Sequence, residues 1–411
     1  MATEPARRRA ARAVLGMREP PTVVAALVAA REQLRGLRLL VCSVVSRAPY
    51  AAPEATAALQ VTALFVGPAL RRAVRERRVA YLPCHFSALP RLVRRGDLPA
   101  TAVLLHLSPP DADGWCSTGL AADHTLAALD AARPVIGEVS PAVPYVYGGN
   151  RVHLGALDLV VEGHAAPEVF ARAMPGKVER AIGDRVAALI RDGATIETGF
   201  GAVSEAALAA LRGHRDLGLH SGLLGDGAMD LIERGVITGR RKSIDRDLAV
   251  SCAIRGSAAL YRWVDRHPAV RLEPFDYTHS LDTLARLEHF VAVNSALQVD
   301  LTGQVNAEGL GWVTLSGAGG QVDWVRGALA APGGRSIIAL PSLAGGEHST
   351  IVPCFAPGTP VTTTRAEAHY VVTEHGVADL RAKTLPERAA ALIAIADPSV
   401  REDLSRAAAE L

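Results

Sequence analysis

Residues 194–221 read ATIETGFGAVSEAALAALRGHRDLGLHS, and this stretch decides the class of fold. ATIETG (194–199) is a β-branched run typical of a buried strand, and EAALAALR (205–212) is an Ala- and Leu-rich run typical of a helix. We expect Ser204 to be the N-cap of this helix and LGLHS (217–221) to be the next strand. Strand, glycine-rich turn, helix and strand in this order form a βαβ unit, the building block of a parallel sheet.

The same alternation of short apolar runs with helical stretches continues through the rest of the chain. With 411 residues the chain exceeds what one hydrophobic core usually serves, so two domains are expected. We therefore predict an α/β fold of two tandem open α/β domains with mainly parallel sheets, the first at 1–175 and the second at 176–411. The strand-like runs are LRLLVCSVV, VAYLP, TAVLLHLS, PVIGEVS and LDLVVEG in the first half, and ATIETG, LGLHS, VAVNSALQVD, RSIIALP and HYVVTE in the second.

Charge and cysteine content narrow the classes of function. The formal net charge of +2 at pH 7 does not favour nucleic acid or a membrane as partner, so we expect small-molecule chemistry. The five cysteines include no CxxC pair, which predicts reduced thiols in a cytoplasmic protein. The Arg-rich start MATEPARRRAARAVLG (1–16) lacks the apolar run of a signal peptide. We expect a frayed basic end there, with an organellar transit peptide as the alternative, and no apolar run is long enough to span a bilayer.

Two glycine-rich turns are candidate binding loops. The turn after ATIETG would let backbone N–H groups at a helix start approach a phosphate or an acyl oxygen. The turn in SGAGGQVDWVRGA (316–328) would present amides as an oxyanion hole, before a helix that opens at Gln321 or Val322. Each turn is also compatible with a purely structural role. The candidate binding residues in these turns are Gly199, Phe200, Gly201, Ala202, Val203, Gly319 and Gly320.

Two further loops place an acid beside a histidine. GEHST (346–350) brings Glu347 next to His348 among small residues, and TEHG (373–376) repeats the pairing. Such a pair suits a general base, although a solvated loop without a catalytic role fits the same residues. His369 and His375 do not have the spacing of a helical metal pair, so we expect no metal.

A series of ordered motifs runs from about Val14 to Leu404. They are SPPDADGWCSTG, PVIGEVSPAVPYVYGGNRVHLGALDLVVE, GFGAVSEAAL, LGLHSGLLGDGAMDLIERGVIT, VNSALQVDLTGQV, SGAGGQVDWVRGA, IIALPS and TTRAEAHYVVTEHGVADLR. Together they resemble the acetyl-CoA hydrolase/transferase family, which includes 4-hydroxybutyrate CoA-transferases and related family I CoA-transferases. The resemblance implies two similar α/β domains with acyl-CoA bound between them, as a substrate and not as a permanently held cofactor.

The resemblance also implies a covalent mechanism with a glutamate nucleophile. In the family the glutamate attacks acyl-CoA to form an acyl-glutamyl anhydride, and CoA returns as a glutamyl thioester. That glutamate directly follows the pattern L-H-[ST], which here is Leu219-His220-Ser221, and the next residue of this chain is Gly222. Hydrogen cannot replace a carboxylate nucleophile. Gly222 therefore argues against ordinary CoA transfer.

Other departures from the family lie among the polar positions. The family usually has Glu where Gln298 stands and Asn where Ser140 stands. It often has a lysine near Gly345 and an arginine at the position of Thr350, and we count Gly345 among the binding residues. In a strand, alternate residues share a face, so His220 should point toward the space that Gly222 leaves. The candidate general bases are, in order, His220, Asp226, Glu347 and His348.

We expect an enzyme of the acyltransferase or CoA-transferase class. The first hypothesis is direct transfer of an acyl group from CoA or another pantetheine thioester to an amine, a hydroxyl or water, without an enzyme-bound anhydride. The second is CoA transfer by a relocated carboxylate, and the third is a non-catalytic acyl-CoA-binding homologue. The expected partners are an acyl-CoA or acyl-carrier thioester and a small-molecule acceptor, with a homodimer among the expected assemblies.

Overall fold

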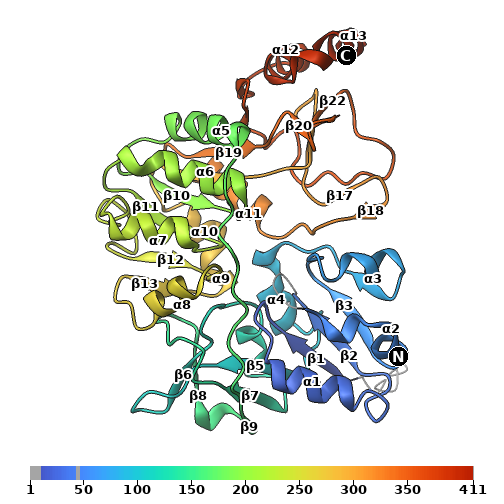
Figure 1. The fold of residues 1–411 in the computed structure, drawn as a ribbon, viewed down its shortest axis with the longest axis vertical. Coiled ribbons are helices and arrows are strands. Elements are labelled where there is room, and N and C mark those ends of the chain that lie inside the picture. Colours follow the sequence, from blue (N-terminus) through green and yellow to red (C-terminus); the bar gives the residue numbers. More distant parts are fainter. Residues whose placement is uncertain (1–10, 43–46, 411) are drawn as a thin grey trace, which may run out of the picture.

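The structure is a computed structural model that describes residues 11–42 and 47–410. Two large sheets organise the chain, and helices flank both of them (Figure 1). The first sheet has seven strands, all paired in parallel, in the order β4-β3-β2-β1-β5-β7-β9. Its strands are β1 (Arg12–Leu15), β2 (Arg38–Val41), β3 (Gln60–Ala63), β4 (Val79–Tyr81), β5 (Ala102–Leu107), β7 (Val135–Val139) and β9 (Leu159–Glu162).

The second sheet has eight strands in the order β13-β12-β11-β10-β14-β19-β23-β24. All of its pairs are parallel except the hairpin of β23 and β24. Its strands are β10 (Thr195–Thr198), β11 (Gly218–Ser221), β12 (Ala249–Ser251), β13 (Val270–Leu272), β14 (Phe290–Asn294), β19 (Arg335–Ala339), β23 (Tyr370–Thr373) and β24 (Gly376–Asp379). The predicted α/β class with mainly parallel sheets is confirmed.

The two sheets share one construction. In each, the first strand of its half lies in the interior, with the next strands added on one side and the later strands on the other. The order of strands therefore reverses between β1 and β5 in the first sheet and between β10 and β14 in the second. The carboxyl ends of strands at such a reversal are where open α/β sheets normally bind ligands. The predicted division into 1–175 and 176–411 falls between β9 and α5 and stays a prediction.

Helices and small sheets complete the architecture. The helices are α1 (Pro21–Ala29), α2 (Pro53–Thr56), α3 (Arg71–Arg75), α4 (Leu89–Arg94), α5 (Lys177–Ala188), α6 (Ala202–Ala210), α7 (Asp226–Glu233), α8 (Ala258–Val264), α9 (Phe275–Thr278), α10 (Leu281–Leu284), α11 (Gln321–Ala330), α12 (Leu385–Ile395) and α13 (Arg401–Ala408). The small strands are β6 (Trp115–Ser117), β8 (Arg151–His153), β15 (Gln298–Asp300), β16 (Val305–Asn306), β17 (Gly309–Leu310), β18 (Val313–Thr314), β20 (Leu343–Ala344), β21 (His348–Ser349) and β22 (Ile351–Val352). Within the described ranges no helix is long and apolar enough to cross a membrane.

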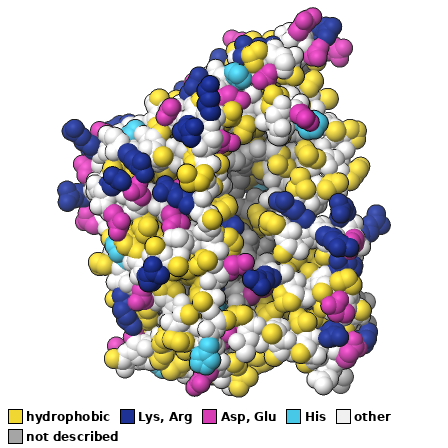
Figure 2. Space-filling model, in the orientation of Figure 1, with side chains coloured by type: hydrophobic (Ala, Val, Ile, Leu, Met, Phe, Trp, Pro, Cys, Tyr) yellow, Lys and Arg dark blue, Asp and Glu magenta, His cyan; other side chains and the backbone are white. Residues whose placement is uncertain are grey.

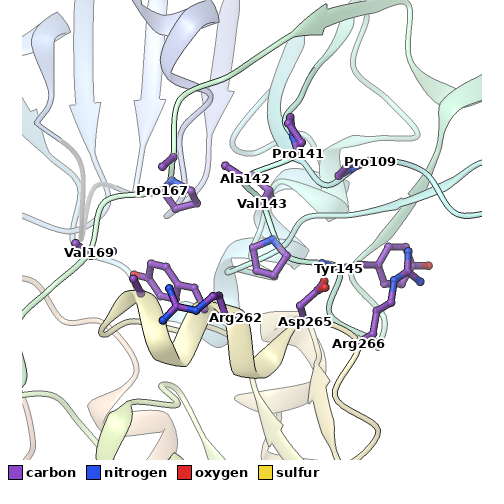
Figure 3. Close-up of a pocket in the computed structure, with 14 residues that line it drawn as sticks. Pro109, Pro141, Ala142, Val143, Tyr145, Pro167, Val169, Arg262, Asp265 and Arg266 are labelled. Carbon is purple, nitrogen blue, oxygen red and sulfur yellow. Dashed lines mark hydrogen bonds between the residues drawn. The ribbon is translucent and has the colours of Figure 1, made fainter.

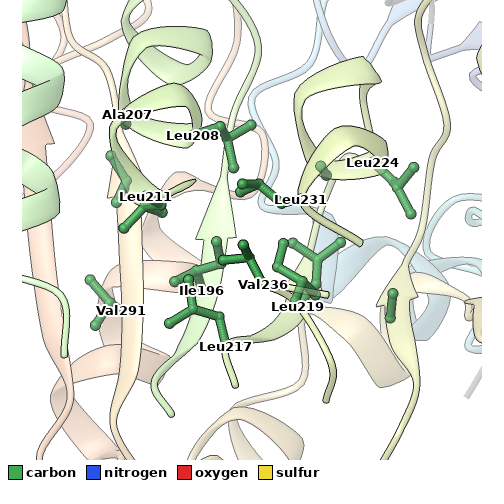
Figure 4. Close-up of a cluster of buried hydrophobic side chains, with 14 of the residues drawn as sticks. Ile196, Ala207, Leu208, Leu211, Leu217, Leu219, Leu224, Leu231, Val236 and Val291 are labelled. Carbon is green, nitrogen blue, oxygen red and sulfur yellow. The ribbon is translucent and has the colours of Figure 1, made fainter. Parts of the chain in front are cut away.

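The core of the second half explains why its strands are stable. Leu208 of α6 and Leu231 of α7 pack against Ile196 and Leu219, which lie on adjacent strands (Figure 4). All four side chains are at most 4% exposed. Burying a leucine or isoleucine side chain contributes roughly 1.5–3 kcal/mol. These contacts occupy one face of β10 and β11 and leave the opposite face for Glu197 and its neighbours.

Three local predictions need correction. The helix after β10 begins at Ala202 with Gly201 as its N-cap, so Ser204 lies inside the helix and is buried. The predicted strand 291–300 is two strands, β14 and β15, in different sheets. Residues 12–15, expected in the frayed start, form the central strand β1 of the first sheet. The rest of that expectation, at residues 1–10, lies outside the described residues.

Candidate functional site

A cleft of about 310 Å³ lies between the two sheets, at the carboxyl ends of their strands. Met17 and Arg18 line it just after β1, Gly199 and Phe200 line it just after β10, and Asn294 lines it at the end of β14. These strands flank the reversals of strand order, so the cleft is where an α/β fold usually holds its ligand. Figure 2 shows this face of the molecule hollowed between the two halves.

Gly222 lines the cleft immediately after β11. Its φ lies outside the left-handed region, so the backbone at this position would accept a side chain. A Cβ at Gly222 would meet the ring of Trp324, with Cζ2 at 3.3 Å and Nε1 at 3.6 Å. The Gly222 carbonyl accepts a hydrogen bond from Cys252 Sγ at 3.1 Å. The local geometry therefore does not require a glycine here.

Glu197 of β10 is the one carboxylate among the described residues that line the cleft. The parallel register pairs Glu197 with Ala292 of β14, and Asn294, two residues further on, points to the same face. Asn294 Nδ2 donates to Glu197 Oε2 at 3.0 Å. Burial raises the pKa of Glu197 to about 8, although hydrogen bonds from Asn294 and the Val293 amide partly offset this effect. Such a group exchanges its proton near neutral pH, as a general acid or base must.

His279 also lines the cleft, just after α9. The Thr278 hydroxyl donates to the Pro274 carbonyl at 3.2 Å and lies 2.9 Å from His279 Nδ1. Because that hydroxyl proton is already used, Nδ1 carries the ring proton and Nε2 is left as an acceptor. Burial lowers the pKa of His279 to about 3, so the ring is neutral at neutral pH. A Cβ at Gly320 would come within 2.5 Å of His279 Nε2, which explains the glycine at that position.

The glycine-rich turn before α11 forms another part of the wall, as predicted. Gly319 and Gly320 both line the cleft, and α11 opens at Gln321. The turn is anchored on the first half of the chain, because Phe86 N donates to the Gly319 carbonyl at 3.0 Å and Ala318 N donates to Tyr81 Oη at 3.0 Å. Gly319 has a φ of +55°, a conformation that favours glycine.

His220, the first predicted base, is fully buried and does not line the cleft. Its Nε2 lies 3.1 Å from the Thr278 carbonyl, and its ring stacks edge-on against Trp324. Burial, together with the charge of Lys242, lowers the pKa of His220 to about 3. This position favours a packing role for His220 over the proton transfer that the sequence predicts.

The other predicted bases lie away from Gly222. Asp226 is the first residue of α7, and its carboxylate accepts from the Ser257 hydroxyl at 2.5 Å and the Ser257 amide at 3.0 Å. Glu347 and His348 are exposed in the hairpin of β20 and β21, as is Gly345. None of these four residues lines the cleft.

The predicted binding residues after β10 fall into two groups, one in the cleft wall and the other at the start of α6. Gly199 and Phe200 line the cleft, whereas Gly201, Ala202 and Val203 do not. Gly201 has a φ of +117° and caps α6, which Ala202 and Val203 begin. The glycine at 201 is therefore explained by the backbone conformation of the turn.

A second hollow, of about 550 Å³, lies beside α8 (Figure 3). It is lined by prolines, including Pro141 and Pro167, together with Arg262 and Asp265. The Asp265 carboxylate accepts a hydrogen bond from the Tyr145 amide at 2.7 Å, which gives this carboxylate a structural role. Across the described part of the chain, no group of three or more His, Cys, Asp or Glu side chains could hold a metal ion.

Comparison with known proteins agrees with this architecture. Residues 14–170 match the acetyl-CoA hydrolase/transferase N-terminal domain, and residues 256–408 match the corresponding C-terminal domain. A 4-hydroxybutyrate coenzyme A transferase of Clostridium kluyveri is 40% identical over 388 residues, which are 94% of this chain and 90% of the relative. The chain belongs to the acetyl-CoA hydrolase/transferase family. The family assignment supports the expectation of a transferase-class enzyme, with hydrolysis as the related outcome.

Solved structures of the family share the fold. RipA from Yersinia pestis superposes with a TM-score of 0.92 at 32% identity, covering 98% of this chain and 94% of RipA. A 4-hydroxybutyrate CoA-transferase from Porphyromonas gingivalis superposes with a TM-score of 0.82 at 33% identity, covering 97% of this chain and 93% of that chain. This chain therefore keeps the acetyl-CoA hydrolase/transferase scaffold along its whole length.

Glu197 and His279 were not among the predicted site residues. Glu197 lies inside ATIETG, where the β-branched pattern indicates only a buried strand. A charged residue in the middle of a buried strand was the available signal, since buried carboxylates usually have a functional or pairing reason. His279 lies in a short segment that carries no motif, so only the folded chain brings it to the cleft.

Proposed function

We propose that this protein transfers the acyl group of a CoA thioester directly to an amine, a hydroxyl or water, without forming an anhydride at position 222. The main support for this proposal is that Gly222 lies in the cleft, at the position where the family resemblance predicts the glutamate. Glycine has no group that can attack a thioester. Because the φ of Gly222 would permit a side chain, loss of the carboxylate is not a backbone requirement.

Glu197 is the group best suited to move the proton in this reaction. The acceptor nitrogen or oxygen forms a bond to the thioester carbonyl carbon while its proton passes to the Glu197 carboxylate. The C–S bond then breaks, and the same proton passes to the CoA sulfur, which releases free CoA and the acylated acceptor. A carboxyl with a pKa of about 8 can hold and release this proton near neutral pH.

Other residues that line the cleft supply the remaining polar groups. Asn294 orients Glu197, and His279 offers its unprotonated Nε2 to an acceptor N–H or O–H. The turn at Gly319 and Gly320 supplies backbone close to the cleft, where amide donors could stabilise the oxyanion that develops at the carbonyl.

A second candidate uses Glu197 as a relocated nucleophile. The observation that favours it is that Glu197 is the cleft's single carboxylate in the described residues. Its raised pKa lowers the ionised fraction that both the base and the nucleophile require, so a covalent adduct is what distinguishes the two roles. A third candidate, acyl-CoA binding without catalysis, predicts that CoA is bound but never released from a thioester.

Mass spectrometry separates these candidates. The native protein is incubated with acetyl-, butyryl- or succinyl-CoA, with and without glycine as an amine acceptor, and free CoA is measured alongside the intact protein mass. Release of CoA with an unmodified protein supports direct transfer. A CoA adduct that maps to Glu197 and is lost after borohydride reduction would support the relocated nucleophile and overturn the first proposal.

Two matched variants assign the proton transfer. Glu197→Gln should lower turnover by about 10²–10⁴-fold if Glu197 is the general base. Glu347→Gln removes a predicted acid in an exposed hairpin outside the cleft and should leave turnover unchanged. If Glu347→Gln lowers turnover and Glu197→Gln does not, the general base is Glu347, one of the acids that the sequence predicts.

A further inference from the structure

Two arginines meet in the wall of the cleft without a paired carboxylate. Arg18 lies shortly after β1 and Arg255 lies shortly after β12, and both residues line the same cleft as Gly222. Within residues 11–42 and 47–410, no carboxylate oxygen lies within 4.0 Å of either guanidinium. The charge of Glu168 acts on both, but its carboxylate is paired with Arg47 at 4.0 Å.

Neutral acceptors hold Arg18 in place. Its Nη2 donates to the Ile254 carbonyl at 2.9 Å and to Tyr261 Oη at 2.8 Å, and its Nη1 donates to the Glu168 carbonyl at 3.4 Å. None of these acceptors carries a charge, so they orient the guanidinium without neutralising it. Burial lowers the pKa of Arg18, which reflects the cost of this uncompensated charge.

Aromatic rings hold Arg255 in place. Its guanidinium carbon lies 3.8 Å from the centre of the Phe200 ring and 4.0 Å from the centre of the Phe170 ring. Contacts with aromatic ring faces hold the guanidinium without using its N–H groups, which stay available for hydrogen bonds. Its Nε is buried and has no hydrogen-bond partner. The charge of Arg18 and burial both lower the pKa of Arg255.

The backbone of Arg255 runs beside the segment that follows Gly222. Arg255 N donates to the Leu224 carbonyl at 3.1 Å, and Leu224 N donates to the Ala253 carbonyl at 2.9 Å. The Arg255 segment therefore runs beside the chain that leaves Gly222. An anion bound by the two guanidiniums would belong to a molecule that also occupies the reacting end of the cleft.

We propose that Arg18 and Arg255 bind a carboxylate, separate from the reacting group, that is carried by the acyl chain or by the acceptor. The planar guanidinium edge matches the two oxygens of a carboxylate, and an anion would relieve the repulsion between the two charges. The substrate class is then a dicarboxylic acid monothioester, or an amino or hydroxy acid as acceptor. This inference rests on the proposed function, because it names the substrate of the same cleft.

Unreactive ligands test the carboxylate directly. S-(3-carboxypropyl)-CoA and S-butyl-CoA are thioethers that differ in the terminal carboxylate, so binding can be measured by calorimetry without turnover. We expect the native protein to bind the carboxylated ligand at least tenfold more tightly if the acyl chain carries the group. If the acceptor carries it, succinate or β-alanine should bind to the complex with S-butyl-CoA.

Variants assign the effect to the arginines. Arg255→Gln should weaken the carboxylate-dependent binding by about 10- to 100-fold, the range expected when a charge-assisted hydrogen bond is lost, and should leave S-butyl-CoA unchanged. Arg255→Lys keeps the charge without the planar edge and should show a smaller loss. Arg262→Gln removes an exposed arginine of α8 outside the cleft and should change neither ligand.

The outcomes distinguish the carboxylate from a phosphate of CoA. An equal loss for CoA, S-butyl-CoA and the carboxylated ligand in Arg255→Gln would assign the arginines to a CoA phosphate and overturn the proposal. Native protein that binds S-butyl-CoA, but shows no preference for a carboxylate in either arm, would also overturn it. Failure to bind any CoA species would instead refute the proposed function.

Discussion

Replacing Glu197 by glutamine should change how stability depends on pH. The pKa of Glu197 is about 8 in the folded protein, against an ordinary value of 4.5. Between these values the folded protein keeps a proton that the unfolded chain releases. The stabilisation is therefore complete below about pH 4.5 and is lost as the pH rises toward 8. Glutamine has no ionisation, so the variant should lack this slope.

The size of the effect follows from the pKa difference. Each pH unit in this interval costs about 1.4 kcal/mol of unfolding free energy per proton. The full interval sets an upper limit of about 5 kcal/mol, and the part between pH 6 and 8 amounts to roughly 2–3 kcal/mol. Glutamine keeps an oxygen that can accept from Asn294 Nδ2, so the packing of the site should be retained.

Urea denaturation at one-unit steps from pH 5 to 9 measures this difference. Subtracting the variant's curve from that of the native protein isolates Glu197, and the difference should fall with pH and flatten above 8. Glu347→Gln, at an exposed position, should give a curve parallel to that of the native protein. A flat difference between pH 5 and 8, or one that rises, would refute the claim that Glu197 is protonated at neutral pH.

Three further changes follow from the cleft. Gly222→Glu should fold, because a Cβ at this position requires only a small shift of the Trp324 ring. Incubation of the variant with acyl-CoA should give a CoA adduct that intact-mass analysis detects. A folded variant with no adduct and no transfer to acetate would count against position 222 as the nucleophile site. His220→Ala should cost roughly 2–4 kcal/mol of stability through a buried cavity with turnover changed less than threefold; a 10²-fold loss in the folded variant would restore the predicted catalytic role. Gly201→Val should destabilise the protein by about 1–3 kcal/mol through backbone strain, which thermal denaturation measures. The affinity for CoA should stay nearly unchanged. Weaker CoA binding at equal stability would instead support the predicted contact between Gly201 and CoA.

The sequence predicts the layered fold well because its strongest signals are local. ATIETG and LGLHS become β10 and β11, and TAVLLHLS contains β5. The central strand β1 escaped notice because RAVL is only four residues long and follows an Arg-rich run. VAVNSALQVD looks like one continuous strand in the sequence, and its division into β14 and β15 depends on which sheets the two pieces join.

The site is harder to predict because it depends on which strand ends become neighbours. Glycine-rich turns can be recognised from their composition, and Gly199 and Gly319 do line the cleft. His220 lies in β11, two residues before Gly222, but Trp324 and the Thr278 carbonyl enclose its ring, and no local sequence pattern encodes that enclosure. Glu197 reaches the cleft because β10 lies between β11 and β14. That order is a property of the whole sheet.

The anchoring of the turn before α11 determines how a substrate can reach the cleft. Phe86 binds the Gly319 carbonyl, and Ser87 binds the carboxylate of Asp323 through its amide at 3.1 Å and its hydroxyl at 2.6 Å. A hinge motion that swung the halves apart would break these bonds and leave the largely buried Asp323 without its partner. These bonds therefore oppose a widening of the cleft, which favours a substrate narrow enough to enter without that motion. The width of the cleft then limits which substrates enter, before any side chain recognises their chemical groups.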